Sequence, residues 1–283
     1  MPVAVLDALD GQLVDDVRAL IKAVQVRDGA PPLSDHAMLQ LSTSRPGLRH
    51  LVLPGGYAQL DDDTAELADR DGVADQLLAA LEPLAPRLIV WSHGQHSPVA
   101  PAATARGYAE HRKLWQLRRP LTDLPDKPLP QGVTVRPFVP GQDEDAWLAV
   151  NAAAFADHAE QGKWTRADIE AREAEPWFDP AGFLLAERGD ELLGFHWTKV
   201  HRKGAGAGKG TGIGEVYVLG IAPAAQGLGL GPALLTAGLA YLAGRGLAEV
   251  LLYVDESNPA AVQLYRKYGF ASYDLDVQYL SRP

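Results

Sequence analysis

Glycine is concentrated in a short stretch that comes directly before an apolar helical pattern. Gln226, Gly229 and Gly231 have the spacing Q-x-x-G-x-G. Residues 215–221 before them predict an apolar strand, and residues 231–245 after them predict a helix. The first amides of a helix have no internal acceptors and lie at the positive end of its dipole, and glycine lets a ligand approach the backbone closely. The stretch therefore predicts an anion-binding loop suited to a pyrophosphate.

A second strand and helix follow this loop. Residues 249–254 have the pattern of a strand that is buried on both faces. Residues 259–268 predict a helix, with Asn258 as its N-cap and Pro259 in the first helical position, where proline is favoured. The alternative is a glycine-rich loop that only helps a helix and a strand to pack. The second strand and helix, at the expected distance from this loop, make that alternative less favoured.

Together the two strand–helix pairs resemble the acetyl-CoA-binding signature of the GNAT family of N-acyltransferases. The resemblance implies an α/β architecture with a mixed sheet, in which pantetheine lies in the gap between two diverging strands. It also implies that acetyl-CoA is held, as co-substrate, by these residues: Leu219, Gly220, Ile221, Gln226, Gly227, Leu228, Gly229, Leu230, Gly231, Pro232, Asn258, Ala260 and Ala261.

The same resemblance implies roles for two side chains in proton transfer. An attacking amine must lose a proton and a leaving thiolate benefits from a proton donor. Tyr265 matches the tyrosine that commonly acts as the acid, and Glu215 lies where many members carry a base. An aromatic side chain that only packs and a solvated glutamate at a strand edge are the alternatives.

Prolines mark a boundary in the middle of the chain. We expect a first domain over residues 1–119, a proline-rich linker over 120–131 and a catalytic domain over 132–283. The second half predicts the order β-α-α-β-β-β-α-β-α-β, and its pieces are 133–138, 143–157, 165–175, 183–188, 191–201, 215–221, 231–245, 249–254, 259–268 and 272–280.

The first half is a fainter copy of this order. Its predicted pieces are 13–26, 34–41, 48–53, 56–60, 64–68, 72–84, 88–91, 98–107 and 113–117. We therefore expect two tandem GNAT-like domains, the N-terminal one degenerate. At the position of the glycine loop this half has Asp69, Asp71 and Asp75 with only Gly72, and carboxylates repel a pyrophosphate. We expect this half to bind no CoA.

The chain further resembles the mycothiol synthases, a tandem-GNAT family of actinobacteria that acetylates the cysteinyl amine of Cys–glucosamine–inositol. The stretches that carry this resemblance are 118–121, 155–165, 194–201, 214–220 and 252–254. The resemblance implies that the acceptor is contacted by Asp35, Glu160, Lys199, Glu215 and Tyr253. An insertion over residues 204–214 departs from the family. Another acceptor amine, in a peptide or an aminoglycoside, and a non-catalytic acetyl-CoA-binding module remain the alternatives.

Composition excludes several other classes of function. The chain has 36 acidic against 26 basic residues, a net charge of −10, which argues against nucleic acid and anionic membranes as partners. It has no cysteine, so thiolate metal sites are excluded. His93 and His96 lack partners at ligand spacing, so we expect no metal. The glycines of 204–212 fail the P-loop pattern. A cytoplasmic monomer that acts on a small-molecule amine is the expectation.

Overall fold

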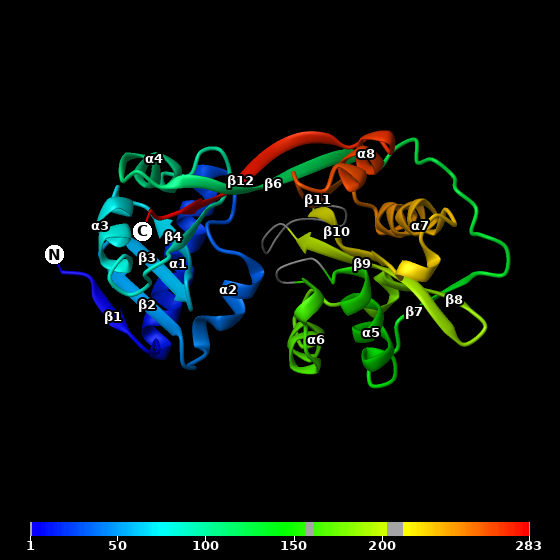
Figure 1. Cartoon of the computed structure of the whole chain (residues 1–283), viewed down its shortest axis with the longest axis horizontal. Helices are drawn as coiled ribbons and strands as arrows, with labels where there is room; N and C mark the ends of the chain where they lie inside the picture. Colours follow the sequence, from blue (N-terminus) through cyan, green and yellow to red (C-terminus); the bar gives the residue numbers. More distant parts are fainter. Residues whose placement is uncertain (1, 157–160, 203–211, 283) are drawn as a thin grey trace. The chain divides into compact units, whose positions relative to one another are not determined.

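The computed structural model describes residues 2–156, 161–202 and 212–282 (Figure 1). The chain forms two compact units. Unit 1 consists of residues 1–116, 254–259 and 273–283, and unit 2 consists of 117–253 and 260–272. The C-terminal segments are thus divided between the units, so that neither unit is one continuous stretch of sequence.

Unit 1 is a mixed sheet with helices on both faces. Its strands follow the order β1-β2-β3-β4-β5-β12-β6. The elements are β1 (Ala4–Leu6), α1 (Gly11–Asp28), α2 (Asp35–Leu39), β2 (Leu48–Leu53), β3 (Gly56–Asp61), β4 (Thr64–Asp69), α3 (Ala74–Leu81), β5 (Ile89–Ser92), α4 (Val99–Ala105), β6 (Ala109–Pro120) and the C-terminal part of β12 (Ala271–Leu280). The predicted elements of the first half are confirmed, apart from the short β1, which the sequence pattern did not indicate.

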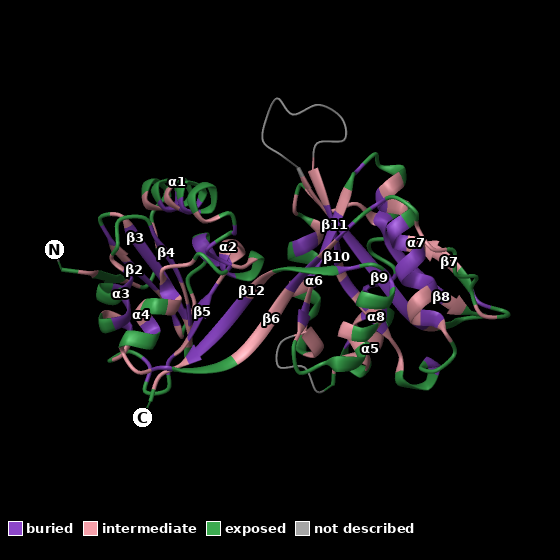
Figure 2. Ribbon diagram, turned by 90° about the horizontal axis from the view of Figure 1, so that it is seen from above, coloured by how far each residue is buried: buried purple, intermediate pink, exposed green. Residues whose placement is uncertain are grey.

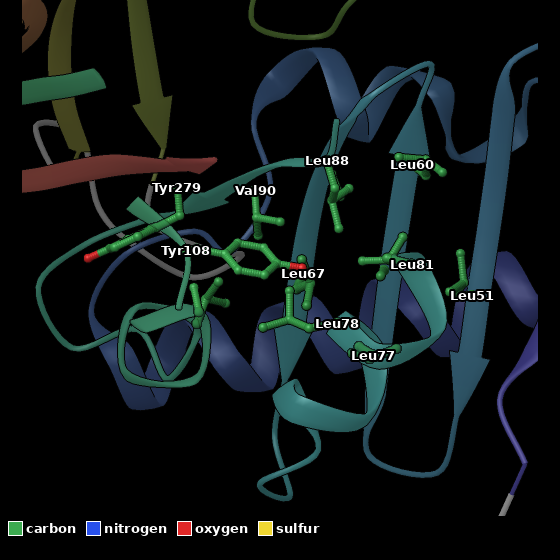
Figure 3. Packing of buried hydrophobic residues seen from close by; sticks show 14 of the residues in the cluster. Leu51, Leu60, Leu67, Leu77, Leu78, Leu81, Leu88, Val90, Tyr108 and Tyr279 are labelled. Atoms are coloured by element: carbon green, nitrogen blue, oxygen red, sulfur yellow. The ribbon is translucent and has the colours of Figure 1, made fainter. Parts of the chain in front are cut away.

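The two faces of the unit 1 sheet carry separate apolar clusters. On one face, buried residues of α1 and α2, among them Ile21 and Ala37, pack on Tyr57 of β3. On the other face, leucines of α3 pack with Tyr108 and Tyr279 (Figure 3). Two buried faces explain why strands β2, β3, β4 and β5 are mostly buried (Figure 2).

Unit 2 repeats the architecture with its own series of parallel and antiparallel strands. Its strands follow the order β6-β11-β10-β9-β8-β7. The elements are β7 (Thr134–Pro137), α5 (Glu144–Ala154), α6 (Arg166–Glu173), β8 (Phe183–Arg188), β9 (Glu191–Arg202), β10 (Gly212–Ile221), α7 (Leu230–Gly244), β11 (Glu249–Asp255) and α8 (Pro259–Lys267). With β12 at its end, this series has the predicted order of strands and helices, which is therefore confirmed.

Aromatic side chains fill the core between the unit 2 sheet and helices α5 and α6. Trp147 of α5 is fully buried and meets Phe195 and Trp197 of β9 edge-on, with ring centroids 5.3 and 5.8 Å apart. Leu230 and Leu234 of α7 belong to a cluster on strands β8 and β9. Strands β9 and β10 are thereby held between helical layers.

The last strand of the chain lies in a different unit from the one its sequence position suggests. Residues Val277–Leu280 of β12 pair antiparallel with Ser92–Ile89 of β5, inside unit 1. The bend at 254–259 also packs with unit 1, where Arg112 forms an ion pair with Asp255. The packing units therefore differ from the expected limits 1–119 and 132–283, because strand pairing depends on a partner far away in the sequence.

A carboxylate of the chain itself occupies the start of helix α3, where a phosphate loop would lie. Asp69 is 2% exposed, and its two oxygens accept hydrogen bonds from the amides of Gly72, Val73 and Ala74 at 2.7–2.9 Å. An anion at these amides satisfies the donors of the first helical turn. This arrangement supports the expectation that unit 1 binds no CoA there.

A histidine whose side chain is 12% exposed joins three segments of unit 1. His93 Nδ1 lies 2.9 Å from Asp276 of β12, and His93 Nε2 lies 3.1 Å from Glu66 of β4. Glu66 also accepts a 2.6 Å hydrogen bond from the Ser34 hydroxyl, next to the start of α2. Burial alone would keep the imidazole neutral, but the carboxylates of Asp276 and Glu66 raise the pKa of His93 to about 10.

We expect the stability of the protein to fall as the pH rises from about 7 toward 9. A raised imidazole pKa stabilises the fold fully below the ordinary pKa of about 6.5 and loses this effect as the pH approaches the folded-state value. In this window each step of one in pH should lower the free energy of unfolding by at most about 1.4 kcal/mol. Thermal unfolding midpoints across this range measure the slope, and His93→Gln should flatten it. Equal slopes for the two proteins would show that His93 is not charged in the folded state.

Candidate active site

The central strands of unit 2 are paired over only part of their length. Within the described residues, the parallel pairing of β10 with β11 covers Gly214–Val216 and Val250–Leu252. A register shift in the β9–β10 pairing falls between Val216 and Val218 and leaves Tyr217 as the extra residue. A bulge of this kind bends its strand and disrupts the ladder. Beyond it, β10 continues to Ile221 beside β9, and within the described residues its other edge is not paired with β11 there.

The predicted anion loop connects the end of β10 to helix α7. Gly227 and Gly229 have φ angles of +79° and +78°, which other residues adopt only with strain, and Gly229 directly precedes α7. Within the described residues, no hydrogen bond reaches the backbone amides from 227 to 231. A row of free amides at the start of a 15-residue helix fits a pyrophosphate.

We expect Gly229→Ala to raise the KM for acetyl-CoA by about tenfold or more. The substitution costs on the order of 1–2 kcal/mol at this positive φ, and the loop can relieve the strain only by moving its amides. Steady-state kinetics with varied acetyl-CoA measures the effect. Gly244→Ala, at the other end of α7, meets no atom within 4 Å and is the matched control. A wild-type KM in Gly229→Ala would argue against a role for this turn.

Close packing leaves no room for a side chain at Gly220. A Cβ atom at this position would lie 2.7 Å from the ring of Phe195 and 3.1 Å from the ring of Phe155. The side chain of Leu230 is buried, whereas Leu228 is 46% exposed. Gly220 and Leu230 are both among the predicted acetyl-CoA residues. Because the space beside Gly220 is filled and the side chain of Leu230 is buried, each can contact a ligand only through its backbone.

Glu215 and Lys199 lie side by side on the face of the sheet that α5 and α6 cover. They are direct partners in the β9–β10 register, and each is buried. Nε2 of His201, two residues beyond Lys199 on the same face, lies 2.6 Å from Oε2 of Glu215. Lys199 Nζ also lies over the rings of Trp177 and Tyr217, at 4.5 and 5.3 Å from their centroids. The site therefore combines a buried carboxylate with a buried ammonium.

Tyr265 is a buried residue of helix α8. Its ring meets Phe270 edge-on, with centroids 5.7 Å apart. Burial raises the pKa of its hydroxyl to about 12, so the group stays protonated throughout the neutral range. No residue in the described part of the chain hydrogen-bonds this hydroxyl, which leaves it available as a donor.

An arginine that the sequence did not single out stands beside these residues. Arg172 of α6 is 5% exposed and lies over the ring of Trp164, 3.8 Å from its centroid. Its Nε donates to the Tyr217 hydroxyl at 3.0 Å, and its Nη1 donates to the carbonyl of Asp168 at 2.8 Å. Trp164 and Trp177 were the signal in the sequence that could have pointed to Arg172. Their spacing, however, does not indicate which cation lies over their rings.

The remaining predicted acceptor residues are distributed over the chain. Tyr253 is half-buried on β11 and shares a face with Leu251, the partner of Glu215. Asp35 is exposed at the start of α2 in unit 1. Glu160 and most of the 204–214 insertion fall outside the described residues. Asn258 lies in the bend after β11 and groups with unit 1, whereas Ala260 and Ala261 lie in the first turn of α8, in unit 2.

Two further observations concern metals and membranes. In residues 2–156, 161–202 and 212–282, no three histidine or acidic side chains are grouped as metal ligands would be. None of the helices in the same part of the chain is both long and apolar enough to cross a membrane.

Comparison with known proteins finds a family match within the second half of the chain and relatives that match nearly the whole chain. Residues 151–270 match the model of the acetyltransferase (GNAT) family. The chain is 49% identical to a mycothiol acetyltransferase from Salinispora arenicola, over 96% of this chain and 94% of that protein. It is also 49% identical to one from Streptomyces avermitilis, over 97% and 93% of the two chains.

Solved structures share the fold across both units. A tandem GNAT protein from the clavulanic acid biosynthesis pathway superimposes with a TM-score of 0.69 at 18% identity, covering 99% of this chain and 98% of that one. A GCN5-related N-acetyltransferase from Sphaerobacter thermophilus gives 0.66 at 24% identity, covering 99% and 96%. The expected fold, a tandem repeat of GNAT-like domains built on mixed sheets, is confirmed.

Proposed function

This chain belongs to the mycothiol acetyltransferase family, and we propose that it transfers the acetyl group of acetyl-CoA to the cysteinyl amine of Cys–glucosamine–inositol, forming mycothiol. The observation that carries acetyl transfer is the arrangement in unit 2. There a partly unpaired strand leads into a loop of free amides, with a buried glutamate on the same strand. The likeness to relatives over nearly the whole chain supports the choice of acceptor.

The geometry supports a division of labour along β10 and α7. The edge of β10 at Leu219, Gly220 and Ile221 would pair with pantetheine. The amides from Gln226 to Gly231, followed by Pro232, would hold the pyrophosphate, because free helix N-terminal donors favour anions. Asn258, Ala260 and Ala261 are proposed to face the CoA arm at the start of α8.

Glu215 and Tyr265 would move the protons of the reaction. Glu215 takes a proton from the acceptor ammonium, so that the amine nitrogen can attack the thioester carbon. As the C–N bond forms and the C–S bond breaks, Tyr265 gives its proton to the departing sulfur. The surplus proton on the new amide nitrogen returns to the Tyr265 phenolate, which restores the acid, and Glu215 releases its proton to solvent, which restores the base.

The acceptor would lie on the face of the sheet that carries Glu215. Lys199 and Tyr253 share this face, and we propose that both contact the acceptor. Asp35 and Glu160 are proposed acceptor contacts on the family likeness alone. A monomeric state and a cytoplasmic location remain predictions from the sequence.

The test is a reaction of the purified protein with acetyl-CoA and Cys–glucosamine–inositol, followed by mass spectrometry. We expect an acetylated product and an equal amount of free CoA thiol. An acceptor whose cysteinyl amine is already blocked should give neither. Acetyl-CoA binding without product would contradict the proposed acceptor, and a panel of peptide and aminoglycoside amines would then identify another. Binding without transfer to any amine would instead support a non-catalytic acetyl-CoA-binding module.

A further inference from the structure

The two oxygens of the Glu215 carboxylate have different surroundings. Oε2 lies 2.6 Å from Nε2 of His201, whereas Oε1 has no hydrogen-bond partner in the described ranges. The Glu215 side chain is 8% exposed and that of His201 is 39% exposed. A carboxylate with one oxygen held by a donor keeps a single orientation and presents its other oxygen to a substrate.

We propose that His201 is a positioning residue for acetyl transfer, which donates Nε2–H to Oε2 of Glu215 and thereby directs Oε1 to the acceptor amine. This inference rests on the proposed function, because it gives Glu215 the role of base. It adds a residue that the sequence pattern did not single out. A proton-abstracting group must lie within hydrogen-bond reach of its substrate, so the orientation of the carboxylate governs the rate.

Among the neighbours of Glu215 on β9 and β11, His201 is the one placed to orient the carboxylate. Lys199 stands opposite Glu215 in the register, but its ammonium lies over the rings of Trp177 and Tyr217. On the neighbouring strand β11, the partner of Glu215 is Leu251, which has no polar side-chain group. His201 alone among these neighbours is seen at hydrogen-bond distance from the carboxylate.

Two substitutions of His201 separate positioning from packing. His201→Leu keeps similar bulk and removes the donor, and we expect kcat to fall about 10- to 100-fold with little change in the KM for acetyl-CoA. His201→Gln retains an N–H donor at a similar reach, and we expect it to recover kcat to within about threefold of wild type. His111→Leu, at an exposed position of β6, is the control and should behave as wild type.

The possible outcomes are distinct. Wild-type kcat in His201→Leu overturns the proposal, and so does an equal loss in His201→Leu and His201→Gln, which would mean that the ring itself is needed. Circular dichroism and acetyl-CoA binding show whether each variant is folded. If wild type gives no product with Cys–glucosamine–inositol, the acceptor proposal fails, and the same series is run on an amine that wild type does acetylate. If wild type acetylates no amine, both proposals fail.

Discussion

Replacing Glu215 with glutamine is expected to lower kcat for acetyl transfer by about two to four orders of magnitude. An amide has the shape of the carboxylate but cannot take a proton at any accessible pH, so the acceptor amine would remain an ammonium. The carbonyl oxygen of glutamine can still accept a hydrogen bond from His201, which keeps the local structure. Steady-state kinetics with thiol detection measures the loss, and acetyl-CoA binding should be unchanged.

The control for this substitution is Glu249→Gln on the neighbouring strand. Glu249 has a side chain that is 45% exposed and pairs with Arg118 at 3.4 Å. An exposed pair of this kind contributes little to stability, so activity should be that of wild type. If Glu215→Gln retained wild-type kcat over the whole pH range, the base would have to be sought elsewhere on this face, and the positioning role of His201 would fall with it.

Local chemistry explains why so much of the fold could be predicted from sequence. The helix expected at 165–175 is capped as its residues indicate, with Thr165 and Asp168 hydrogen-bonded reciprocally. Pro259 begins α8, and Gly189, between the strands expected at 183–188 and 191–201, has the positive φ that glycine allows. Each of these features depends on residues within a few positions of one another.

Long-range pairing explains what the sequence did not reveal. The final strand, β12, was expected as part of the second domain, but it pairs with β5 of unit 1. His93 lies in the loop after β5, and the sequence did not indicate that it contacts carboxylates 27 and 183 residues away. These contacts follow from how strands are ordered in a sheet, which residue periodicity does not encode.

The candidate site shows the same division. Glu215, Tyr265 and the glycine loop were predicted because their motifs are local or resemble a known signature. His201 and Arg172 were missed, since their partners, Glu215 and Tyr217, lie 14 and 45 residues away. Only the sheet register reveals that Lys199 stands opposite Glu215. The sequence motifs therefore indicate the type of reaction, and the strand register indicates which residues lie next to Glu215.

The second large effect is expected from Tyr265→Phe, which should lower kcat about 100-fold with little change in the KM for acetyl-CoA. The substitution removes only the hydroxyl, so the edge-on contact with Phe270 remains. Because burial raises the pKa of this hydroxyl to about 12, Tyr265 stays protonated, and its ionisation should cause no loss of wild-type rate below about pH 10.

Tyr268→Phe provides the matched control for this acid, since Tyr268 is buried to the same extent close to the end of the same helix. We expect Tyr268→Phe to retain wild-type kcat, because the leaving sulfur is proposed to take its proton from Tyr265 alone. An equal fall in both variants would mean that tyrosine hydroxyls here support packing. A full rate in Tyr265→Phe would mean that the thiolate leaves without a proton from the protein. Pre-steady-state kinetics of CoA release distinguishes slower chemistry, which a missing acid predicts, from slower product release.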